Sequence, residues 1–72
     1  MDMDEIDKRH GGPYDRGSAD SYYGRRRRPH YFKGGSYKTE EIPEYRMSKQ
    51  QIAEYNLGFD ENEASQNFKE YE

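Results

Sequence analysis

Cysteine, tryptophan and valine are absent from this chain of 72 residues. Without cysteine there can be no disulfide framework, no thiolate metal site and no cysteine nucleophile. No apolar run approaches the roughly 18 residues of a membrane-spanning helix, and the acidic N-terminus lacks the apolar core of a signal peptide. We therefore expect a protein that stays soluble in the cytoplasm and does not contact a membrane.

Aliphatic side chains are also scarce. Leucine, isoleucine, valine and phenylalanine together make up 7 of the 72 residues, far below the roughly 20% under which chains tend to be disordered. Eight tyrosines and three phenylalanines partly compensate, because an aromatic ring packs well while the tyrosine hydroxyl keeps a polar contact. We expect one domain at most, whose fold a partner completes by supplying further burial.

The net charge of −3 conceals a basic centre between two acidic ends. Residues 1–9 carry a net charge of −2, residues 10–36 carry +4 and residues 37–72 carry −5. Such asymmetry concerns partners more than fold. The basic centre favours an anionic partner, whereas the simplest interpretation of the acidic C-terminal tail is a solvated surface.

A first helix is predicted over residues 13–25, after an acidic N-terminus, residues 1–12, that we expect to be disordered. A proline at the first position suits an opening helical turn. Glycine inside a helix is about 1 kcal/mol less favourable than alanine. Gly17 therefore predicts that another backbone packs closely against the helix at this position. Gly24 is a typical stop signal.

The second helix has the best local signals, and it is predicted within residues 48–72 together with the acidic tail. Ser48 followed by Gln51 forms a capping-box motif at its start. Residues 26–47, which show no clear period, are expected to be a flexible basic and aromatic linker. The predicted fold class is therefore all-α, a small two-helix protein with frayed acidic termini. The residues expected to form the helix contact are Tyr14, Gly17, Tyr22, Ile52, Tyr55, Gly58 and Phe59.

Catalytic chemistry finds little support in the sequence. His10 and His30 lie in glycine- or proline-flanked segments without the spacing of metal ligands, and no glycine-rich segment has the pattern of a phosphate loop. A chain this small also has little material to enclose a water-excluding pocket. We expect no enzymatic activity, no metal and no cofactor.

Four consecutive arginines followed by aromatic residues are the most informative feature. Guanidinium groups bind phosphate, and interleaved rings can stack on bases, which is how many proteins bind single-stranded RNA. Alternatives remain open at this stage: the run could be a solvated face, a cap on the first helix, or a docking site for an acidic protein surface. The residues expected to bind nucleic acid or a partner are Arg25, Arg26, Arg27, Arg28, Tyr31, Phe32 and Lys33.

Two glycine patterns resemble the ribosome modulation factor family. Arg16 and Gly17 are followed, after six residues, by Gly24 and Arg25, and Pro29-His30-Tyr31 comes shortly afterwards. Further on, Tyr55-Asn-Leu-Gly58-Phe59 is similar to the aromatic–glycine–aromatic pattern of that family's second helix. The chain differs from the family in its acidic ends and in a longer link between the two patterns.

The resemblance implies a small regulator of translation that binds the ribosome near ribosomal RNA. The chain is also similar to short proteins of tailed bacteriophages in its stretches Gly-Pro-Tyr-Asp-Arg-Gly (residues 12–17) and Tyr-Tyr-Gly-Arg (residues 22–25). This similarity implies the cytoplasm of a bacterial or phage-infected cell. The alternative is a phage-encoded factor that binds and inhibits or redirects a host protein complex. A third interpretation is a component that orders only within an oligomer or larger assembly.

Overall fold

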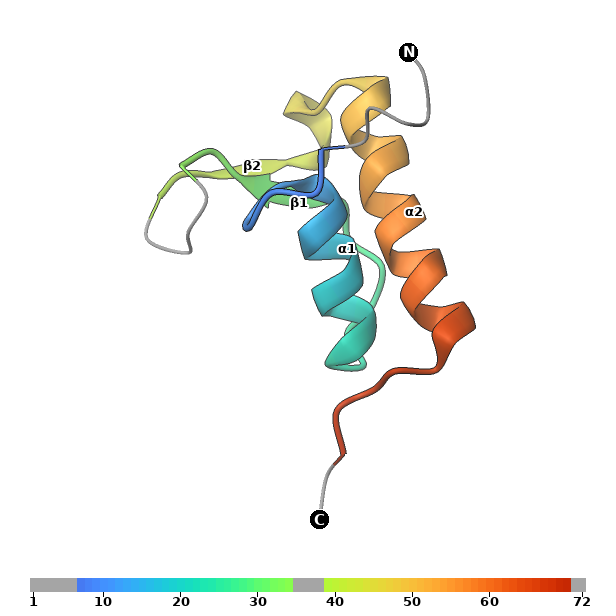
Figure 1. Ribbon diagram of the computed structural model, residues 1–72. Helices are drawn as coiled ribbons and strands as arrows, with labels where there is room; N and C mark the ends of the chain where they lie inside the picture. Colours follow the sequence, from blue (N-terminus) through green and yellow to red (C-terminus); the bar gives the residue numbers. More distant parts are fainter. Residues whose placement is uncertain (1–6, 35–38, 71–72) are drawn as a thin grey trace.

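The computed structural model describes residues 7–34 and 39–70, and it combines two helices with a short two-stranded sheet. Helices α1 and α2 lie side by side and run in the same direction, while the β1–β2 pair lies beside the N-terminal part of α1 (Figure 1). The elements are α1 (Pro13–Tyr22), β1 (His30–Phe32), β2 (Glu41–Pro43), the 3₁₀ helix η2 (Glu44–Arg46) and α2 (Lys49–Ser65). The prediction of a small two-helix protein is confirmed, but the description as all-α omits this sheet.

Helix α1 ends three residues earlier than predicted because of the backbone of Gly24. That glycine adopts a φ of +70°, and two bonds close the helix end: its N–H donates to the carbonyl of Ser21 at 3.0 Å, and the N–H of Arg25 donates to the carbonyl of Asp20 at 2.8 Å. This pair of bonds is the Schellman arrangement, which turns the chain away from the helix axis. The arginines that follow therefore lie outside the helix.

Helix α2 begins at the predicted capping box. The N–H of Gln51 donates to the hydroxyl of Ser48 at 3.1 Å, and the N–H of Ser48 donates to the Gln51 side chain at 2.9 Å. The helix ends where Gln66 adopts a left-handed φ of 56°. Beyond it, the N–H of Lys69 donates to the carbonyl of Tyr22 at 2.8 Å, so the described part of the acidic tail lies against the end of α1.

Two glycines set the distance between the helices. A Cβ atom at Gly17 would overlap the backbone carbonyl of Tyr55 and lie 2.9 Å from the backbone nitrogen of Phe59. On the opposite helix, a Cβ atom at Gly58 would overlap the backbone carbonyl of Tyr14. Each glycine thus lies where the other helix passes, and the absence of both side chains lets the two backbones touch.

The core forms around this crossing and extends to the sheet. Tyr55 is fully buried, and Phe59, Ile42 and Met47 are buried around it, with Ile52 packed against them. The predicted contact residues Tyr14 and Tyr22 are half-buried at the edge of the helix pair.

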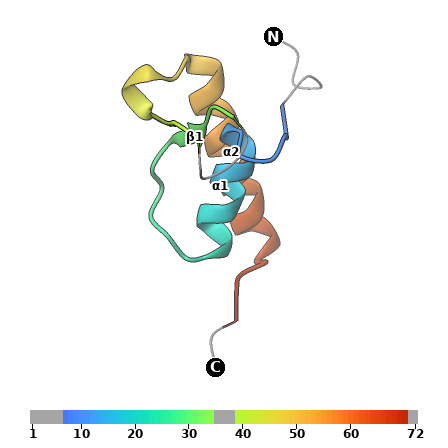
Figure 2. The same ribbon diagram turned by 90° about the vertical axis from the view of Figure 1, so that its left-hand side faces the viewer.

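The segment predicted as a linker returns along the helices and then forms the sheet. Because α1 and α2 are parallel, residues 23–29 must run back to the starting end of the pair, as both views show (Figures 1 and 2). Strands β1 and β2 are antiparallel, with Tyr31 opposite Ile42. Strands of three residues are too short to show an alternating pattern, which explains why the sequence reads as a linker here.

The N-terminal stretch expected to be disordered is described from residue 7 onward, and residues 1–6 lie outside the described part. The carbonyl of Gly11 accepts a hydrogen bond from the N–H of Phe32 at 2.8 Å. The N–H of Asp7 donates to the buried carboxylate of Glu54 at 3.0 Å. These contacts connect residues 7–12 to both the sheet and α2. No helix of the described chain is long and apolar enough to cross a membrane.

Candidate nucleic-acid interface

A hollow of about 620 Å³ lies where α1, the returning segment and the sheet meet. Four arginines and two carboxylates face it, so its lining is positively charged, and two aromatic rings form parts of its wall. The lining residues are Arg16, Asp20, Tyr23, Arg25, Arg26, Arg28, His30, Phe32 and Glu41.

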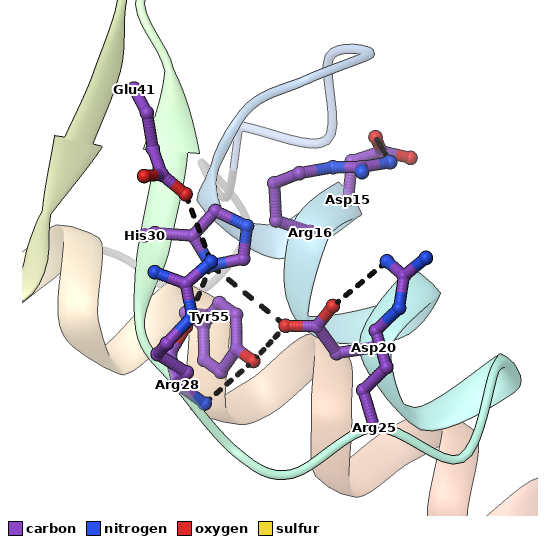
Figure 3. A network of polar contacts seen from close by, with 8 residues as sticks. All are labelled: Asp15, Arg16, Asp20, Arg25, Arg28, His30, Glu41 and Tyr55. Carbon is purple, nitrogen blue, oxygen red and sulfur yellow. Dashed lines mark hydrogen bonds and ion pairs between the residues drawn. The ribbon is translucent and has the colours of Figure 1, made fainter. Parts of the chain in front are cut away.

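The floor of the hollow is a buried polar network centred on Asp20 (Figure 3). The Tyr55 hydroxyl donates a hydrogen bond to the Asp20 carboxylate and accepts one from the backbone N–H of Arg28 at 3.0 Å. Burial, together with this bond to Asp20, raises the pKa of Tyr55 well above its ordinary value. The phenol therefore stays protonated, and the core residue of α2 holds the floor in place.

His30 completes the floor from strand β1 and is only 4% exposed. Its Nδ1 lies 2.7 Å from the carbonyl oxygen of Arg28 and 3.8 Å from the carboxylate of Asp20. Its other nitrogen, Nε2, points away from Asp20 toward the side on which Arg16 lies (Figure 3). Nε2 has no hydrogen-bond partner among the described residues.

The four consecutive arginines do not act as one row. Arg25 lies 3.5 Å from the Asp20 carboxylate, and its guanidinium lies 4.9 Å from the centre of the Tyr23 ring. Arg28 pairs with Glu41 at 2.9 Å. Arg26 is exposed and forms no ion pair with any described residue. Three members of the run thus reach the hollow, two of them already partnered by carboxylates.

Arg27 turns to the opposite side, away from the hollow. It pairs with Asp60, donates to the side chain of Asn56 at 2.9 Å, and places its guanidinium 4.4 Å from the centre of the Phe59 ring. All three partners belong to α2. Arg27 therefore connects the returning segment to the second helix, which is a structural role that the sequence did not predict.

The aromatic residues after the arginines are also divided. Phe32 faces the hollow, with its ring edge-on to His30 at 5.7 Å and the Arg16 guanidinium 5.9 Å from its centre. Tyr31 packs against the core, and its hydroxyl accepts a hydrogen bond from Gln51 at 3.2 Å. Lys33 is exposed and does not line the hollow.

Several residues that line the hollow are not among the predicted binding residues. Arg16 and Asp20 lie four residues apart on α1, Tyr23 follows the helix, and Glu41 lies in β2. The acid and base on one helix face were the only available signal, and it is weak without the sheet that covers them. Within the described ranges, no three histidine or carboxylate side chains are placed to hold a metal ion.

A second surface lies on the other side of the returning segment. An open groove of about 700 Å³ runs beside η2, and at its edge the ring of Tyr45 is 87% exposed. The residues that line this groove are Arg28, Pro29, Pro43, Glu44, Tyr45, Met47 and Ile52. Its apolar lining distinguishes it from the charged hollow.

Comparison of the chain with protein-family models, curated proteins and solved structures finds no match. The resemblance to ribosome modulation factor therefore rests on the two glycine patterns alone.

Proposed function

We propose that this protein is a non-catalytic RNA-binding regulator whose hollow holds the sugar–phosphate backbone of single-stranded RNA. The observation that carries the proposal is the convergence of four arginines and two aromatic rings on one concave surface. Guanidinium groups pair with phosphate oxygens, and aromatic or guanidinium planes stack on unpaired bases. The bases of a double helix are stacked on one another, so aromatic rings beside the phosphate contacts favour a single strand with unpaired bases.

The rim of the hollow supplies the phosphate contacts. Arg25, Arg26 and Arg28 are exposed there, and the ion pairs of Arg25 and Arg28 are partly or wholly solvent-accessible. An exposed pair such as Arg28–Glu41 contributes about 0–1 kcal/mol, so a phosphate can replace Glu41 as the partner of Arg28 at little cost. The rings of Tyr23 and Phe32 offer stacking surfaces beside these arginines.

The proposed target is ribosomal RNA in the cytoplasm of a bacterial or phage-infected cell. The resemblance of the two glycine patterns to ribosome modulation factor supports this choice. The close helix crossing at Gly17 and Gly58 is the structural consequence expected of glycines at those positions. The acidic ends give the chain a net charge of −3, so binding depends on the local field of the hollow rather than on overall attraction.

A salt titration with one matched pair of variants tests the proposal. We expect single-stranded RNA to bind with a log–log salt slope of about −2, since three rim arginines at roughly −0.7 each release counterions. Arg26→Gln should weaken binding and reduce the slope by about 0.7, without unfolding the chain, because Arg26 has no ion pair among the described residues.

The control is Arg46→Gln, which removes the same charge at an exposed position outside the hollow. Arg46 lies in η2 and pairs only weakly, at 3.4 Å, with Glu40. Its substitution should leave both affinity and slope nearly unchanged. A flat salt dependence, or equal effects of the two substitutions, would rule out the hollow as the RNA site.

The second candidate function is a protein-interaction factor, and the exposed ring of Tyr45 beside an apolar groove favours it. Exposed aromatic residues next to a groove are typical anchors at protein interfaces. Capture of partners from a cell lysate, with and without nuclease, separates the two functions. A single protein retained after nuclease treatment and lost in Tyr45→Ala would support this alternative.

A further inference from the structure

We infer that the hollow selects RNA over DNA by accepting a hydrogen bond from a ribose 2′-hydroxyl at Nε2 of His30. This inference rests on the proposed function, because it names the class of nucleic acid that the same hollow binds. It starts from an unusual feature of the floor, a buried imidazole with one nitrogen engaged and the other without a partner among the described residues.

The tautomer of His30 follows from its contacts. A carbonyl oxygen can only accept a hydrogen bond, so the 2.7 Å contact with the Arg28 carbonyl requires a proton on Nδ1. The carboxylate of Asp20, 3.8 Å from the same nitrogen, favours a proton there as well. In the neutral ring, Nε2 then carries a lone pair and can only accept.

The two carboxylates of the hollow already have hydrogen-bond or ion-pair partners. Asp20 accepts from the Tyr55 hydroxyl and pairs with Arg25, and Glu41 pairs with Arg28. Nε2 is therefore a buried acceptor in the lining that lacks a donor among the described residues. The side chain of His30 is 5% exposed, and His30 lines the hollow. A ligand atom inside the hollow can therefore reach it.

The ligand must present a donor close to a phosphate. The arginines around the hollow are all donors and suit phosphate oxygens, whereas a phosphate or base carbonyl would repel the lone pair of His30. In a nucleic-acid backbone, the donor that adjoins every phosphate is the ribose 2′-hydroxyl, which DNA lacks. Base amino groups also donate, but they lie on the far edge of the base.

The sharpest test changes the ligand and leaves the protein intact. Oligouridylate and oligodeoxyuridylate of equal length carry the same base and differ only in the 2′-hydroxyl. We expect the RNA to bind about threefold to tenfold more tightly, as one neutral hydrogen bond would produce. An oligomer with 2′-fluoro groups keeps an RNA-like sugar but cannot donate, so it should bind as weakly as the DNA.

A conservative variant assigns the effect to His30. In His30→Asn, the side-chain amide can replace Nδ1 as a donor to the Arg28 carbonyl, but nothing replaces Nε2. This variant should bind RNA and DNA equally, at the affinity that wild type has for DNA. The control Arg46→Gln, which lies outside the hollow, should keep the RNA preference. If His30→Asn does not fold, the ligand series still decides the matter.

The outcomes separate this inference from the proposed function. Equal binding of RNA and DNA, with the salt slope retained, would overturn the inference and leave RNA binding by the hollow in place. Binding of the 2′-fluoro oligomer as tight as RNA, or an RNA preference retained in folded His30→Asn, would also overturn it. Binding of neither nucleic acid would overturn both.

Discussion

Substitution of Gly17 by alanine tests the close helix crossing on which the whole fold depends. The added methyl group would overlap the Tyr55 carbonyl, which is backbone and cannot move aside like a flexible side chain. Overpacking of this kind costs about 1–3 kcal/mol, and separation of the helices would also expose part of Tyr55 and Phe59. That lost burial costs about 2 kcal/mol more. Alanine is favoured over glycine in a helix by about 1 kcal/mol, so we expect a net loss of about 2–4 kcal/mol.

That loss is large for a chain of this size, whose total stability is on the order of 4–11 kcal/mol. Urea unfolding followed by far-ultraviolet circular dichroism measures it directly. Gly58→Ala should behave in the same way, because its methyl group would overlap the Tyr14 carbonyl at the same crossing. The two losses should not add in the double variant, since either substitution already separates the helices.

Ala53→Gly is the control, because it makes the opposite exchange at an exposed position of α2, away from the helix contact. It should lose only the propensity difference of about 1 kcal/mol. If Gly17→Ala proved as stable as wild type, or more stable by the amount that Ala53→Gly loses, the helix backbones would not touch. The glycine would then need another explanation.

Three further predictions concern the polar contacts of Tyr55 and Ser48. Tyr55→Phe should cost about 1–3 kcal/mol in urea unfolding, because buried Asp20 loses a donor. Since burial raises the pKa of Tyr55 above its ordinary value of 10.0, stability should persist below about pH 10 and fall at higher pH as the unfolded phenol ionises. A titration of unfolding midpoints should show a smaller fall in Tyr55→Phe, and an equal fall would contradict this reasoning. Ser48→Ala should cost about 1 kcal/mol by removing the α2 cap; a loss below a few tenths would show that the capping box does not stabilise the helix.

The helices could be predicted from sequence because their signals are local. The capping box of Ser48 and Gln51 places the start of α2 correctly, and the interior glycines indicate a close approach. Gly24 correctly predicts a stop, but the predicted range of residues 13–25 extends three residues beyond the observed end at Tyr22. In the structure, the Schellman turn already satisfies the carbonyls of Asp20 and Ser21.

The hollow could not be predicted, because its residues become neighbours only when the sheet forms. Arg16 and Asp20 come from α1, His30 from β1 and Glu41 from β2, and three-residue strands have too little pattern to reveal the pairing. The division of the four arginines between two sides could not be predicted for a related reason. Arg27 lies against side chains of α2, whereas Arg25, Arg26 and Arg28 line the hollow, and these neighbours come together only when the chain folds.

The floor and the rim of the hollow have different roles in the proposed RNA binding: the floor is part of the folded core, and the rim contacts the ligand. The floor belongs to the core, because Asp20 is held by the buried hydroxyl of Tyr55, so its geometry is fixed before any ligand arrives. Among the rim arginines, Arg26 has no ion pair with a described residue, Arg28 pairs with the exposed carboxylate of Glu41, and Arg25 reaches buried Asp20 only at 3.5 Å from an exposed guanidinium, so they can exchange partners. Affinity should therefore follow rim charge and salt, whereas the choice between RNA and DNA should follow the fixed acceptor of His30. Rim substitutions should change the salt slope without changing the RNA preference, and His30→Asn should do the reverse.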